Sequence, residues 1–259
     1  MYGAGGWRGL HVPALQARRL ATPELAGTIQ QLWFAGVENQ EVRGTLLELI
    51  EAGRLADCAD VAYEVAIDHT RDARERLSAL QVLAAINDAR LPSLLDRMAA
   101  REPNWDSELA ANAVVHLFPQ TMSVTQLLGI LPGVTFQKHS VGGIPRYLPD
   151  AVSRAQLPPG ELETLRQGLT QLIREESKWN ASEYRIRSDR EELAGALLRV
   201  CELQIHDRAP HASLSESCAV CLQLSRNDDY YEGGSKPLRA ILTDAPATLR
   251  SAWSSKAQV

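Results

Sequence analysis

The feature that most constrains the fold is a run of four short amphipathic segments between Asn39 and Arg101. Apolar residues recur in each segment at intervals of three and four positions, the spacing of one buried helix face. In chain order these residues are Val42, Leu46, Leu47, Leu49 and Ile50; Leu55, Cys58, Ala59, Ala62, Val65 and Ala66; Leu77, Leu80, Leu83 and Ala84; and Leu91, Leu94, Leu95 and Met98. Breaks of two to five residues separate the segments. Such short links force neighbouring helices antiparallel, so the sequence predicts an all-α fold, an α-solenoid of stacked helical hairpins.

The composition agrees with packed helices. Hydrophobic residues make up 45% of the 259-residue chain and aromatic residues only 5%, which favours helices packed through Leu and Ala. No apolar run reaches the roughly 18 residues of a membrane helix, and the N-terminus lacks the pattern of a signal peptide. We therefore expect a soluble cytoplasmic protein with no membrane partner.

The charge balance bears on what the chain binds. Its formal net charge is -5, whereas a general nucleic-acid binder needs a concentrated basic surface to neutralise phosphates. Nucleic-acid binding on a HEAT-like concave face is therefore only an alternative. The arginines that it would use are Arg18, Arg19, Arg71, Arg74, Arg76, Arg185, Arg187 and Arg190.

The helical pattern divides the chain into five parts. They are an irregular lead-in over residues 1–12, an N-terminal helical-repeat array over 13–132, an irregular loop over 133–149, a C-terminal helical array over 150–253 and a polar tail over 254–259.

Three local signals refine this organisation. Thr22 and Pro23 are predicted to start a helix whose buried stripe is Leu25, Ile29, Leu32 and Trp33. Ser188 with Glu191 is predicted to form a capping box at the start of a helix over 189–205. The set Asp72, Arg76, Ala79 and Leu83 is similar to the second helix of a HEAT repeat, in which the acidic residue offsets the helix dipole and the small residue lets the next helix approach.

The segment 133–149 is the one long interruption of the helical pattern. Loops longer than about 12 residues in compact proteins are often functional. Its polar and aromatic residues Lys138, His139, Arg146 and Tyr147 are therefore our candidates for binding a partner. The alternative is an ordinary surface connection with a short helix around 150–154.

The cysteines offer a weak metal candidate. Cys218 and Cys221 form a C-x-x-C pair, and Cys201 and His206 could complete four zinc ligands. However, the pair lies within a predicted helix over 214–224, where positions i and i+3 share one face, so packing is the favoured interpretation and no metal site is assigned. Four cysteines are also too few and too unevenly spaced for a disulfide framework.

No catalytic motif is present. The chain has no P-loop, no H-E-x-x-H and no G-x-S-x-G sequence, and we predict neither an enzyme nor a cofactor. An enzyme with an unfamiliar site, around His139 or His206, is the remaining alternative.

Several segments resemble one known group of proteins. They are residues 39–43, 46–50, 53–60 and 76–80, with later pieces at 117–119, 123–128, 147–149 and 238–250. In these segments the chain resembles the helical-repeat region of large bacterial NACHT-like or STAND-type ATPases, which are associated with antiphage defence. The matching motifs are packing motifs.

The resemblance implies a sensor or a partner-binding scaffold. In that group an ATPase core precedes the repeats, and this sequence has no ATP-binding core, so ATPase activity is not carried over. The chain is then expected to be a fragment of a longer protein or a relative that kept only the scaffold. We expect a non-catalytic helical-repeat protein that recognises another protein.

Overall fold

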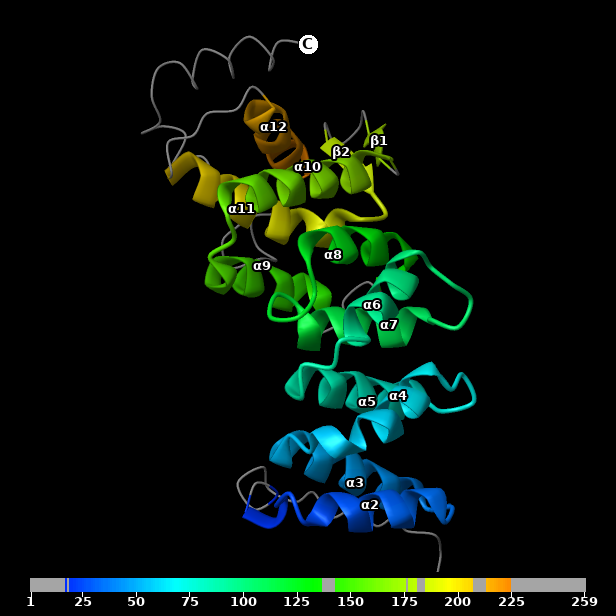
Figure 1. Cartoon of the computed structure of the whole chain (residues 1–259). Coiled ribbons are helices and arrows are strands. Elements are labelled where there is room, and N and C mark those ends of the chain that lie inside the picture. The colour runs from blue at the N-terminus through cyan, green and yellow to red at the C-terminus, as the bar shows by residue number, and fades with distance from the viewer. Residues whose placement is uncertain are drawn as a thin grey trace, which may run out of the picture. The chain divides into compact units, whose positions relative to one another are not determined.

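The computed structural model describes residues 17, 19–136, 143–175, 177–180, 185–206 and 213–224 (Figure 1). These residues are mostly helical, so the predicted all-α class is confirmed apart from one two-stranded hairpin. The chain divides into two compact units, Met1–Leu117 and Phe118–Val259. This division falls earlier than the predicted boundary at residue 132, because the helix after Phe118 packs on a helix of the second unit.

The first unit contains the four predicted segments. Its elements are α2 (Leu25–Phe34), α3 (Gln40–Gly53), the 3-10 turn η1 (Ala56–Cys58), α4 (Ala59–Ile67), α5 (Ala73–Ala85), α6 (Leu91–Ala99) and α7 (Ser107–Leu117). Helix α5 contacts α3, α4, α6 and α7. Leu47, Val61 and Leu80 are among the side chains buried completely between these helices. Each such burial stabilises the unit by about 2 kcal/mol.

The start of α5 shows which contacts Asp72 and Arg76 make. The Asp72 carboxylate accepts a hydrogen bond from the Glu75 backbone N–H (2.7 Å) and caps the helix. One turn later, buried Arg76 donates to the Ala66 carbonyl (3.1 Å) and the Asn104 carbonyl (2.7 Å), and its guanidinium lies 4.8 Å from the Trp105 ring. Arg76 therefore ties the end of α4 to the segment before α7.

An ion pair joins α3 to α5. Arg43 donates through Nε and Nη2 to the two carboxylate oxygens of Glu75, at 2.7 and 3.1 Å. Its Nη1 also donates to the carbonyl oxygens of Val37 and Glu38. Arg43 therefore holds the segment between α2 and α3 as well as the two helices.

The second unit is built around α11. Its elements are α8 (Val124–Ile130), the turn η2 (Leu131–Gly133), α9 (Ile144–Ala155), α10 (Pro159–Glu175), β1 (Ser177–Asn180), β2 (Arg185–Ser188), the turn η3 (Glu191–Leu193), α11 (Ala194–His206) and α12 (Leu214–Leu224). Helix α11 contacts α9, α10 and α12, and α8 packs on α10. The two strands are antiparallel, with Ser177 opposite Ser188.

Helix α9 corrects the predicted loop over 133–149. The helix begins at Ile144, with Pro145 in its first turn and Pro149 inside it. Proline is tolerated in a first turn because the N–H that it lacks has no helical partner there. The buried stripe Ile144, Leu148, Ala151 and Val152 holds the rest of the helix against α11. The part of the predicted loop over 137–142 lies outside the described residues.

The hairpin corrects the predicted capping box. Ser188 ends strand β2, where its hydroxyl donates to the Ile173 carbonyl (2.8 Å) and accepts from the Arg190 backbone N–H. Helix α11 starts only at Ala194, after the turn η3. The serine therefore anchors the strand to α10 and does not cap a helix.

The start and the buried face of α2 also differ from the prediction. The helix begins at Leu25 with Glu24 at the N-cap, two residues after Pro23. Its buried residues are Ala26, Ile29 and Trp33, whereas Leu32 is exposed. Adjacent side chains on a helix point about 100° apart, so a helix that buries only a narrow face can bury Trp33 and leave Leu32 in water.

In the predicted N-terminal array over 13–132, residues 13–16 and 18 lie outside the described residues, and so do the end of the predicted C-terminal array after residue 224 and the tail over 254–259. Among the helices that are described, none combines the length and the apolar character needed to cross a lipid bilayer.

Candidate interaction surface

Helix α2 carries no charged residue in its sequence LAGTIQQLWF. While Ile29 and Trp33 pack inward, Leu32 is 48% exposed and Phe34 is 61% exposed. Leu20 just before the helix and Val42 in the first turn of α3 are exposed as well. Four of the five large apolar side chains exposed in the described part of the chain thus fall between residues 20 and 42. We call Leu20, Leu32, Phe34 and Val42 the α2 surface.

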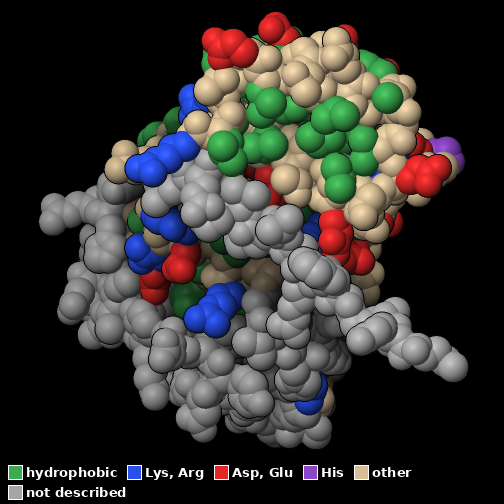
Figure 2. Space-filling model, turned by 90° about the horizontal axis from the view of Figure 1, so that it is seen from below, with side chains coloured by type: hydrophobic (Ala, Val, Ile, Leu, Met, Phe, Trp, Pro, Cys, Tyr) green, Lys and Arg blue, Asp and Glu red, His purple; other side chains and the backbone are tan. Residues whose placement is uncertain are grey.

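Figure 2 looks onto the side of the molecule that carries α2. Hydrophobic side chains gather in the upper part of this view, and acidic side chains lie along the top and right-hand edges. Interfaces between proteins are depleted of charge at their centre and enriched in aromatic residues. The α2 surface is therefore of the kind that another protein covers.

The charges next to the α2 surface are of both signs, because exposed Arg19 directly precedes Leu20. Residues 20–42 include no Lys or Arg, and their three glutamates, Glu24, Glu38 and Glu41, are all exposed. A hydrogen bond with the Thr22 side chain lowers the pKa of Glu24, which keeps this carboxyl ionised.

The first cationic residue after residue 42 is Arg43, whose guanidinium already has hydrogen-bond partners. Its hydrogen bonds to Glu75 raise the pKa of the guanidinium above its ordinary value, and the remaining N–H group points to backbone oxygens. Arg43 therefore does not offset the negative charge beside the α2 surface.

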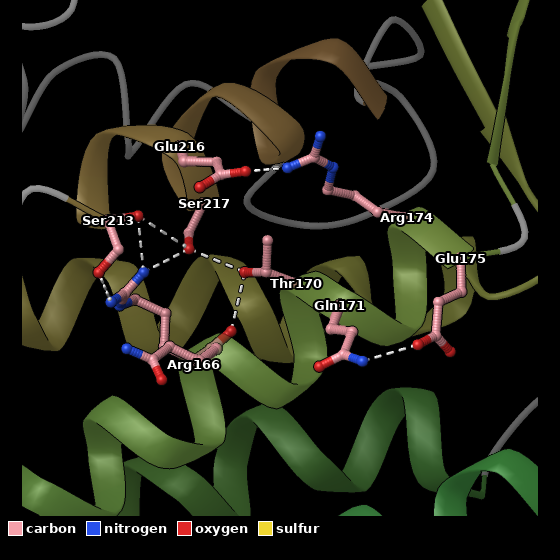
Figure 3. A pocket seen from close by; sticks show the side chains of 9 residues that line it. Arg166, Thr170, Gln171, Arg174, Glu175, Ser213, Glu216 and Ser217 are labelled. Atoms are coloured by element: carbon pink, nitrogen blue, oxygen red, sulfur yellow. Dashed lines mark hydrogen bonds and ion pairs between the residues drawn. The ribbon is translucent and has the colours of Figure 1, made fainter.

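A second feature is an open groove of about 560 Å³ between α10 and α12 (Figure 3). At its rim Arg174 pairs with Glu216, and Gln171 donates to Glu175 (2.7 Å). Arg166 and Ser217 lie deeper in the groove. Its polar side chains mostly satisfy one another.

Buried Arg166 holds α12 against α10. Its Nη1 donates to the Ser213 carbonyl (2.8 Å) and to the Ser217 hydroxyl (2.5 Å), while Nη2 donates to Glu163 (2.5 Å) and to the Ser213 hydroxyl (2.7 Å). Burial alone would raise the pKa of Glu163, but hydrogen bonds from Arg166 and Gln204 lower it to about 2. A carboxylate this acidic is a poor general base at neutral pH, and it also accepts a hydrogen bond from the Ser213 hydroxyl (3.2 Å). The hydrogen bonds in the groove hold α12 against α10.

The cysteine cluster lies in the core of the second unit. Cys201, Cys218 and Cys221 are buried and unoxidised. The hydrogen bond with Cys201 and burial raise the pKa of Cys218; for Cys201, the hydrogen bond to Cys221 and burial outweigh the lowering effect of Cys218. The described residues include no cluster of three or more ligands arranged for a metal ion. The His206 side chain lies outside the described residues.

The candidate partner-binding residues of 133–149 do not form a described site. Lys138 and His139 lie outside the described residues. Arg146 is exposed on α9, whereas the Tyr147 hydroxyl donates to the Phe118 carbonyl (2.6 Å). Tyr147 therefore has a structural contact of its own, and binding through Arg146 stays a prediction.

Most of the arginines proposed for nucleic acid have other partners where their side chains are described. Arg76 is buried, Arg71 pairs with Asp68 and Glu75, and Arg190 donates to three backbone carbonyls around η2. Arg19 and Arg74 are exposed. The side chains of Arg18 and Arg185 lie outside the described residues, and Arg187 has interactions of its own. The geometry adds no support to the nucleic-acid alternative.

The described residues define a mostly helical protein with two exposed large apolar side chains, Leu32 and Phe34, on α2. Comparison of the chain with known protein families, with curated proteins and with solved structures finds no match. The absence of charge from residue 25 to residue 34 is the sequence signal for the α2 surface, whereas the predicted buried stripe had included Leu32.

Proposed function

We propose that this chain is a non-catalytic helical-repeat scaffold that binds another protein through the α2 surface. The observation that carries the proposal is the exposure of Leu32 and Phe34 on a helix without a charged residue. Covering a large apolar side chain stabilises a complex by up to about 1.5–3 kcal/mol, so these two side chains alone would make a substantial contribution to binding.

The contacts of α5 support a repeat architecture in the first unit. Helix α5 packs on its hairpin partner α4 and also on α3 and α7, which lie two helices away along the chain in each direction. Stacked hairpins have this pattern, because equivalent helices of successive repeats share a layer. The Arg43–Glu75 ion pair joins α3 to α5, and Arg76 of α5 donates to the Asn104 carbonyl before α7, so both residues connect successive hairpins.

The biological setting of the proposal comes from the sequence resemblance. A helical-repeat region without an ATPase core, similar to those of bacterial NACHT-like or STAND-type ATPases, would serve as the sensor or partner-binding module of an antiphage system. The partner is then to be sought in bacterial cells with and without phage infection.

The test is affinity capture followed by binding with purified components. The full chain would be compared with a Leu32→Ser/Phe34→Ser variant, with Arg146→Ala, and with Trp179→Ser as the matched control, because Trp179 is 57% exposed in the second unit. A captured protein would be purified and titrated by calorimetry. We expect the double serine variant to lose affinity about tenfold or more, and Trp179→Ser to bind normally.

Three results would contradict the proposal. Equal affinity of the purified partner for the wild-type chain and the double serine variant would exclude the α2 surface, and loss of affinity in Arg146→Ala alone would move the site to α9. Recovery of nucleic acid with no protein partner would replace the proposed function by the nucleic-acid alternative.

A further inference from the structure

We draw no further inference here: the strongest candidate, the polar groove between α10 and α12, has both of its arginines, Arg166 and Arg174, paired with carboxylates of the same two helices, so nothing in the structure shows which ligand it would take.

Discussion

At the residue scale, buried arginines organise both units. Arg76 and Arg166 are almost completely inaccessible, and each donates to backbone carbonyls of other segments. Burial lowers the pKa of Arg76, although the charges of Asp106 and Asp68 oppose this effect. Arg166 instead has a carboxylate in direct contact, Glu163. A buried guanidinium contributes to stability only while its partners stay in place, because removing one partner leaves an uncompensated charge.

The Arg166–Glu163 pair predicts how the second unit responds to acid. Glu163 has a folded pKa of about 2 against an ordinary value of 4.5, so its contribution is fully present above pH 4.5 and is lost as the pH falls through about 2. The difference corresponds to at most about 3 kcal/mol. We expect Glu163→Gln to lower the free energy of unfolding at pH 7 and to flatten its dependence on pH between about 5 and 2.

Urea unfolding at a series of pH values would measure this effect. Glu161→Gln is the matched control, since Glu161 is exposed on the same helix and should behave like the wild-type chain. A wild-type pH profile that Glu163→Gln leaves unchanged would show that the pair does not stabilise the folded unit.

At the element scale, the sequence predicted where helices form more reliably than which elements pack against them. The four segments between residues 39 and 101 are present as helices because their apolar spacing and short links are local properties. Only the first half of α9, residues 144–149, was predicted to be loop, because Pro145 and Pro149 are helix breakers in isolation. Its packing on α11 outweighs that preference. The hairpin over 177–188 was missed since its polar sequence lacks the alternation of a half-buried strand.

Two glycines predict opposite responses to the same substitution. Gly27 in α2 has open space around it, so Gly27→Ala should stabilise the first unit by about 0.5–1 kcal/mol through helix propensity. A Cβ atom at Gly53, the last residue of α3, would lie 2.7 Å from the Ala21 carbonyl oxygen and from its Cβ atom. Gly53→Ala should therefore destabilise by about 1–3 kcal/mol.

Thermal and urea unfolding of the two alanine variants would compare them directly. A stabilised Gly53→Ala would mean that the segment around Ala21 is not held against α3. A destabilised Gly27→Ala would mean that the outer face of α2 is already covered within the chain.

At the scale of the whole molecule, the apolar side chains of α2 separate into those that stabilise the fold and those available for binding. Ile29 is 1% exposed, whereas Leu32 and Phe34 keep about half or more of their surface in water. The separation matters because a binding surface can change without loss of the fold only if its side chains add little to folding stability.

This separation is testable by unfolding. Leu32→Ser/Phe34→Ser should change the free energy of unfolding by less than about 1 kcal/mol, while Ile29→Ser in the same helix should reduce it by about 3 kcal/mol or more. Loss of stability in the double variant comparable to that of Ile29→Ser would place the α2 surface in the folding core and remove it as a binding surface.

The sequence by itself determined the helical class, the helices between residues 39 and 101 and their short connections, because helix formation and chain reversal depend on residues close together in the chain. It also contained the uncharged stretch of α2. Only the tertiary structure decided that Leu32 is exposed while Ile29 is buried, that Pro149 lies inside a helix, and that Arg166 meets Ser213 from 47 residues away. Burial and long-range hydrogen bonds depend on which elements pack together, and the local spacing of residues does not specify these packing partners.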